Sequence, residues 1–155
     1  MPSFHVPLKV EFIDPDPSGP IRRLVRARLG GLVQTMTGRF VRPPDFVLDT
    51  GSTSTLMSAT LARSLSIAVP STTSRLGMTT VGGRRETTVR DGELRVRFDA
   101  LPGHLFRLYC VFSEDVPPSV PPLLGLNDFA DVFRFTVDGT PTPAAAFGAV
   151  HFDTR

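Results

Sequence analysis

The sequence of 155 residues contains only one cysteine and one lysine. A single cysteine, Cys110, excludes an intrachain disulfide, and its place in the apolar run LFRLYCVF (105–112) predicts a buried, inert thiol. The positive charge is carried almost entirely by arginine, since Lys9 is the only lysine, and the formal net charge is only +2. A nucleic-acid surface usually needs a denser basic stripe, so we expect solvated arginines and no nucleic-acid partner.

Metal-ligand clusters and long apolar runs are also lacking. His5, His104 and His151 are far apart and match no ligand spacing, so neither a metal site nor a cofactor is predicted. No run approaches 18 apolar residues, and no basic segment precedes an apolar stretch at the N-terminus. These absences predict no membrane partner and no signal peptide, and a cytoplasmic location is the default expectation.

The apolar residues that are present follow mostly a period of two, which is typical of strands. This length suggests one domain over residues 1–155, with an N-terminal strand and loop in 1–20 and a linker with a final strand in 141–155. Helical spacing occurs only after Ser58, a plausible N-cap, and among Leu126, Phe129, Ala130 and Phe133. The sequence therefore predicts an all-β fold with one or two short helices. The strands are expected in 4–12, 21–29, 93–98, 104–112, 133–138 and 147–152.

The stretch FVLDTGSTSTLMS (46–58) places Asp49 at the end of a buried-looking strand and directly before a sharp turn. A carboxylate can activate water as a general base, but cleavage of a peptide bond also requires a proton for the leaving nitrogen. Two carboxylates that share one proton perform both tasks, because like charges a few Å apart cannot both ionise. Asp49 is therefore either half of a catalytic pair or a structural aspartate that caps a turn.

These residues resemble the active-site segment of aspartic proteases, and two further elements add to the resemblance. Leu123, Leu124 and Gly125 in PPLLGLNDF (121–129) look like the second signature of the family. Between the two motifs, the glycines of LGMTTVGGRRETTVR (76–90) indicate a tight hairpin, where the family keeps its flap. Order and spacing are similar to those of the single-domain retropepsin-like proteases over about residues 21–138. The resemblance implies a closed β-barrel and a two-fold symmetric dimer.

The resemblance also implies the role of each site residue. Asp49 would be the catalytic acid, while Thr50, Gly51 and Ser52 would form the active-site loop. Thr80, Val81, Gly82 and Gly83 would lie in the flap over a peptide or protein substrate. No second Asp-Thr-Gly or Asp-Ser-Gly exists in the chain, so the second carboxylate must come from another subunit. The expected enzyme is a homodimeric aspartic endopeptidase without a cofactor.

Some features depart from the family pattern. Leu126 stands where viral enzymes commonly have arginine, and Thr53 stands where they often have the acid that pairs with it. The first 20 residues and the linker GTPTPAAA (139–146) have no clear counterpart. Two alternatives therefore stay open: a non-catalytic dimer of this fold that binds peptide segments, and an unrelated β-domain in which Asp49 only caps a turn.

Overall fold

The computed structural model describes residues 3–12, 23–49, 52–80, 83–130 and 132–154. Within these ranges the chain forms twelve strands and two short helices, which confirms the prediction of a mostly β fold. The strands are β1 (Phe4–Phe12), β2 (Arg23–Leu29), β3 (Gly31–Gln34), β4 (Phe40–Val41), β5 (Phe46–Leu48), β6 (Thr55–Ser58), β7 (Ser74–Thr80), β8 (Gly83–Phe98), β9 (Phe106–Ser113), β10 (Leu123–Leu124), β11 (Phe133–Asp138) and β12 (Ala149–Thr154). The helices are α1 (Ala59–Ser64) and α2 (Asn127–Ala130).

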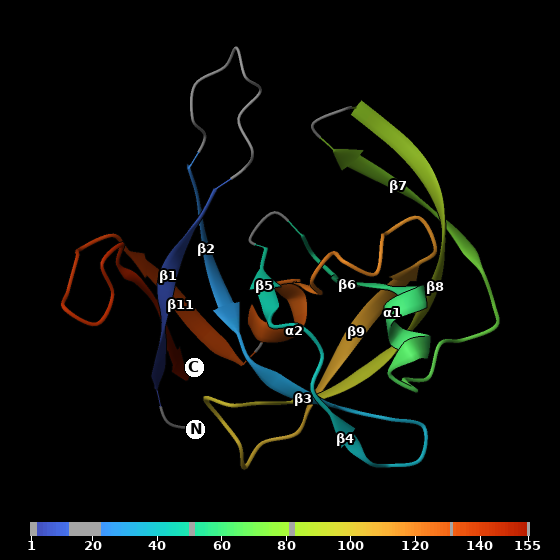
Figure 1. The fold of residues 1–155 in the computed structure, drawn as a ribbon, viewed down its shortest axis with the longest axis horizontal. Coiled ribbons are helices and arrows are strands. Elements are labelled where there is room, and N and C mark those ends of the chain that lie inside the picture. The colour runs from blue at the N-terminus through green and yellow to red at the C-terminus, as the bar shows by residue number, and fades with distance from the viewer. Residues whose placement is uncertain (1–2, 13–22, 50–51, 81–82, 131, 155) are drawn as a thin grey trace.

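The two helices begin close to where the sequence predicts. The Ser58 hydroxyl accepts a hydrogen bond from the backbone amide of Leu61 at 3.3 Å, so Ser58 is the N-cap of α1. The second helix is shorter than its spacing suggests, because α2 ends at Ala130 and Phe133 already belongs to β11. α1 packs near β6 and β9, and α2 packs near β9 and β11 (Figure 1).

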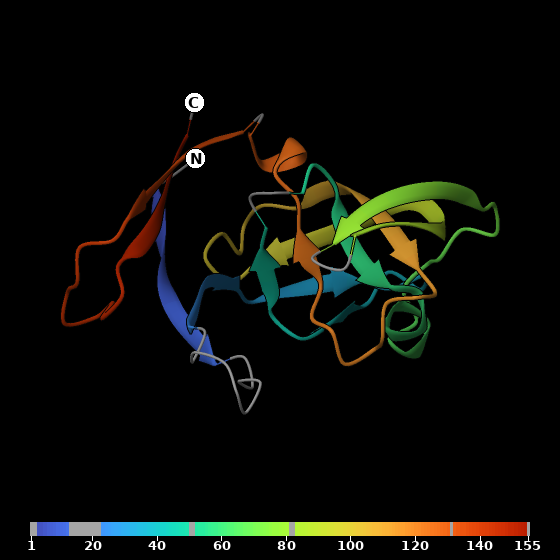
Figure 2. The same cartoon turned by 90° about the horizontal axis from the view of Figure 1, so that it is seen from above.

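The closed barrel expected from the resemblance is wrong. Within the described ranges, the strand order is β11-β12-β1-β2-β5-β10-β6-β9-β8-β3-β4, with β7 paired to β8, and β11 and β4 do not meet. The cause is β1, whose first half pairs with β12 and whose second half pairs with β2. The sheet therefore continues outward into β1, β12 and β11, which stand at one side of the body as a wing (Figure 2).

A cluster of phenylalanines holds this wing, defined as β1, β11 and β12, against the body. The ring of Phe129 on α2 stacks on Phe106 of β9, with centroids 5.4 Å apart, and meets Phe152 of β12 edge-on at 5.9 Å. Phe133 joins the same cluster from β11. These rings are almost fully buried, and aromatic residues bury the largest apolar area per side chain. The short helix α2 is therefore the link between the wing and the remaining sheet.

We predict that Phe129→Ala lowers the free energy of unfolding by about 3–5 kcal/mol, because it removes a ring that four other aromatic side chains contact. Chemical denaturation at a fixed protein concentration measures the loss. Phe147→Ala is the matched control, since this ring is 47% exposed and should change stability by less than about 1 kcal/mol. Equal losses in the two variants would contradict the linking role of α2.

Candidate active site

Asp49 directly follows β5, whose three residues are all buried. The backbone amide of Asp49 donates to the carbonyl of Leu124 at 3.0 Å, and its carbonyl accepts from the amide of Ser52 at 3.2 Å. Before it, the amide of Val47 donates to the carbonyl of Pro122 at 2.9 Å. The backbone on both sides of Asp49 is therefore fixed, and the side chain is left half-buried at the end of the strand.

The segment Leu123–Gly125 crosses beside Asp49 and residues 52–55. β10 pairs in parallel with β5 and antiparallel with β6, so it lies between these two strands (Figure 2). A Cβ atom on Gly125 would lie 2.3 Å from the carbonyl carbon of Ser54, which leaves room for glycine alone. The amide of Gly125 donates to the buried hydroxyl of Thr55 at 3.3 Å.

Two more backbone hydrogen bonds complete this crossover. The amide of Leu126 donates to the carbonyl of Ser52 at 3.0 Å, and the amide of Asn127 donates to the carbonyl of Thr53 at 3.1 Å. Leu126 and Thr53 are the two positions at which the sequence departs from the viral pattern of an arginine and an acid. The backbone joins the two segments here, so the crossover does not depend on an ion pair between these side chains.

The predicted site residues fall into four groups. Asp49, Ser52 and Leu123 line one cleft, while Leu124 and Gly125 are buried. Thr50 and Gly51, and Val81 and Gly82, lie outside the described residues. Thr80 pairs with Gly83, which is the first residue of β8.

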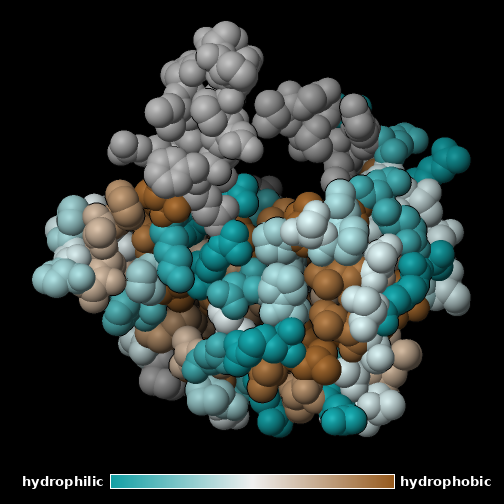
Figure 3. Space-filling model, in the orientation of Figure 1, coloured by the Kyte–Doolittle hydropathy of each residue, from teal (hydrophilic) through white to brown (hydrophobic). Residues whose placement is uncertain are grey.

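The cleft beside Asp49 has a volume of about 600 Å³. Apolar residues of the sheet form one wall, and the first arm of the hairpin, residues 74–77, forms another. Both views show this hairpin of β7 and β8 extending past β6 and β9 (Figures 1 and 2). On the same side, hydrophobic surface is exposed in the middle of the molecule among hydrophilic residues (Figure 3). Polar side chains, among them Asp49, Ser52 and Asp91, line this cleft together with apolar ones such as Leu56 and Val111.

Three polar residues of this cleft, Ser74, Asp91 and Tyr109, were not identified from the sequence. The Ser74 hydroxyl donates to one Asp91 oxygen at 2.6 Å, and the Tyr109 hydroxyl donates to the other at 2.5 Å. The same hydrogen bonds, from Ser74 first and Tyr109 second, lower the pKa of the Asp91 carboxyl, and the pKa of Tyr109 is raised in turn. Asp91 lies between the predicted hairpin (76–90) and the predicted strand (93–98), whereas β8 runs through both without a break.

The remaining predictions concern cysteine, metals and membranes. Cys110 is fully buried in β9, as the apolar run predicts. Among the described residues, no three His, Cys, Asp or Glu side chains come together as a possible metal site. The helices found in the described ranges are too short or too polar to cross a membrane.

Comparisons with solved structures and with family models show which proteins this chain is similar to. The structure matches the crystal structure of a retropepsin-like aspartic protease from Rickettsia conorii with a TM-score of 0.55, at 13% sequence identity, over 97% of this chain and 98% of that chain. This likeness supports a retropepsin-like fold. Residues 22–127 match the model of a family described as aspartyl protease. The chain therefore belongs to the aspartyl protease family. Comparison with curated proteins gave no match.

We predict that Gly125→Ala destabilises the protein by about 3 kcal/mol or more, because the new methyl group would overlap the backbone of Ser54. Thermal and chemical unfolding measure the effect. Gly103→Ala is the matched control, since no atom lies within 4 Å of the methyl group added there. A Gly125→Ala protein as stable as this control would show that the crossover is looser than the structure indicates.

Proposed function

We propose that the protein is an aspartic endopeptidase in which two copies of Asp49, one from each subunit of a homodimer, form the catalytic pair. The observation that carries the proposal is the position of Asp49. Its backbone is fixed by the crossover, its carboxyl group lines the cleft, and it opens the Asp-Thr-Gly motif in a chain of this family. The wing and body share one aromatic cluster, which supports a single domain over residues 1–155.

A second chain is needed because the sequence carries one Asp-Thr-Gly motif, so one chain supplies one copy of the Asp49 carboxyl group. Asp91 lines the same cleft, but each of its oxygens already accepts a hydroxyl hydrogen bond from its own sheet. A two-fold axis through the site would bring two Asp49 residues together, and two-fold dimers are the commonest oligomers. Among the described residues β11 lies at one edge of the sheet, where its outer backbone groups are available to a strand of the second chain.

The mechanism follows from one proton shared by the two carboxyl groups. The ionised carboxylate removes a proton from water as the water oxygen attacks the peptide carbonyl carbon, and the protonated carboxyl donates to the carbonyl oxygen. When the tetrahedral diol intermediate collapses, the C–N bond breaks, the nitrogen takes a proton from the protonated carboxyl, and the ionised carboxylate takes a proton from a diol hydroxyl, so the pair again holds one proton. The apparent pKa values belong to the pair rather than to either Asp49.

The hairpin and the loop would position the substrate. The arms of the hairpin would cover an extended peptide, which would add to the site as a strand. Ser52 keeps the loop compact, since its hydroxyl donates to the carbonyl of Ser54 at 2.7 Å. In this proposal Thr50 braces the catalytic pair, and Gly51 allows the peptide to approach the loop closely. A non-catalytic dimer that binds peptide without cleaving it is the alternative that the experiments must exclude.

We predict that Asp49→Asn abolishes peptide cleavage and leaves fold and oligomeric state unchanged, because an amide cannot act as the general base. Cleavage of a peptide library, with circular dichroism and light scattering beside it, measures this. Asp99→Asn is the matched control, since Asp99 pairs with Arg42 at 2.8 Å on the surface and should be dispensable for turnover. Cleavage by Asp49→Asn at the wild-type rate would end the protease proposal, and binding without cleavage in both proteins would favour the alternative.

We predict further that mixing wild-type protein with an excess of Asp49→Asn protein lowers activity below the value expected from dilution. Mixed dimers would carry only one carboxyl group in the pair and would be inactive. The measurement is activity as a function of the mixing ratio after subunit exchange. Mixing wild-type protein with Asp99→Asn protein is the control. Activity that stays proportional to the total amount of wild-type chain would show that each chain works alone.

A further inference from the structure

The hairpin joins the sheet at its root, near Val89, and the Thr87 hydroxyl in its second arm also donates a hydrogen bond to Asp115. β7 pairs only with β8, from Ser74↔Val89 at the root to Thr80↔Gly83. From Val89 onward, β8 changes partner and pairs with β9, beginning at Val89↔Ser113. The hairpin therefore projects from the sheet beside the cleft as two strands, and two-stranded hairpins are marginally stable by themselves. Its position above Asp49 depends on how the root is held.

On the cleft side, Ser74, Asp91 and Tyr109 form what is here named the root cluster. Each residue comes from a different strand: Ser74 from β7, Asp91 from β8 and Tyr109 from β9. Ser74 is the first residue of β7 and pairs with Val89, so the β7–β8 ladder ends two residues before Asp91. The 2.6 Å hydrogen bond from Ser74 to Asp91 adds a contact between β7 and β8 beyond the last pair of that ladder. The hydrogen bond from Tyr109 attaches the same carboxylate to β9.

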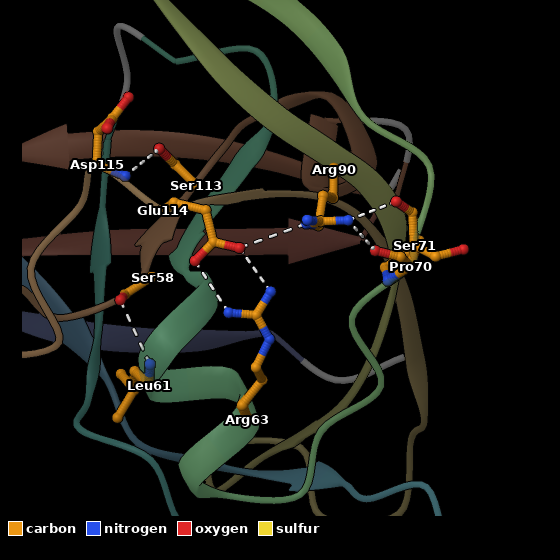
Figure 4. A network of polar contacts seen from close by, with 9 residues as sticks. All are labelled: Ser58, Leu61, Arg63, Pro70, Ser71, Arg90, Ser113, Glu114 and Asp115. Carbon is orange, nitrogen blue, oxygen red and sulfur yellow. Dashed lines mark hydrogen bonds and ion pairs between the residues drawn. The ribbon is translucent and has the colours of Figure 1, made fainter.

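The opposite side of the root is held by a different set of contacts. Neighbouring residues of a strand point to opposite faces, so Arg90 points away from the cleft. Its guanidinium donates to the carbonyls of Pro70 and Ser71 and reaches Glu114 at 3.4 Å, and Arg63 of α1 holds the same carboxylate (Figure 4). These contacts attach the segment that precedes β7 to β8, to α1 and to Glu114, the residue after β9. The Thr87 hydroxyl holds the second arm to Asp115, and the root cluster attaches Ser74 of the first arm to β8 and β9.

We propose that Asp91 is a positioning residue, which with Ser74 and Tyr109 sets the height of the hairpin arms over Asp49 and thereby the affinity for the peptide. The inference rests on the proposed protease function for its effect on substrate, but not for its effect on the hairpin. The lowered pKa of Asp91 supports it, because the carboxylate stays ionised at pH values where a free aspartate is partly protonated. A charged acceptor makes both hydrogen bonds stronger than neutral ones.

The test compares variants that remove one hydrogen bond each: Ser74→Ala, Tyr109→Phe and Asp91→Asn. Amide hydrogen exchange should become on the order of tenfold faster in residues 74–80 and 83–89 and stay unchanged in β5, β6 and β10. KM for a cleaved peptide should rise several-fold while kcat changes by less than about twofold, since Asp49 is not disturbed. Ser74→Thr keeps the hydroxyl and should restore wild-type exchange and KM.

Asp99→Asn is the control for loss of a surface carboxylate, and it should change neither exchange of the hairpin nor KM. Unchanged exchange in Tyr109→Phe and Asp91→Asn would overturn the proposal, as would acceleration spread evenly over the whole sheet. A fall in kcat alone would also overturn it. If wild-type protein cleaves no peptide, the protease function fails, but the exchange measurement still decides whether the root cluster holds the hairpin.

Discussion

The passage of Leu124 and Gly125 between β5 and β6 is the constraint on which the rest of the structure depends. Buried backbone amides must find acceptors, and here those of Asp49, Leu126 and Asn127 find them across the two segments. Neither segment can move without leaving several of these groups unpaired. The crossover holds only because Gly125 has no side chain where the backbone of Ser54 passes. A reactive acid is thereby placed at the end of a rigid strand.

This constraint also explains why the site resembles one half of a two-carboxylate site. In the crossover, backbone amides and carbonyls of the two segments pair with each other, and Asp49 lines the cleft. One ionised carboxylate supplies a general base but not the protonated carboxyl group that must act with it. The other acid of the cleft, Asp91, is engaged by Ser74 and Tyr109. A second copy of the chain is the simplest source of a partner carboxyl group, and a two-fold axis would supply it with identical geometry.

Local patterns predicted the parts of the site that are continuous in the chain. Asp49 and Leu123–Gly125 stand in short motifs, and β1 and β11 match the predicted ranges 4–12 and 133–138. The open sheet was not predictable, because alternation in 4–12 does not reveal that β1 divides its pairing between β12 and β2. The root cluster was not predicted from the sequence for a similar reason. Ser74 and Tyr109 are 17 and 18 residues from Asp91, and only strand register brings them together.

The two halves of the cleft are held by different kinds of interaction, and this difference has a mechanical consequence. Asp49 is fixed by backbone hydrogen bonds between buried segments, which open only when much of the sheet unfolds. The hairpin is fixed at its root by side-chain hydrogen bonds on the exposed Asp91 and Tyr109, which open at a smaller cost in free energy. A cover must move to admit a polypeptide, whereas a catalytic acid must keep its geometry. The distribution of strong and weak restraints in this chain meets both requirements within one sheet.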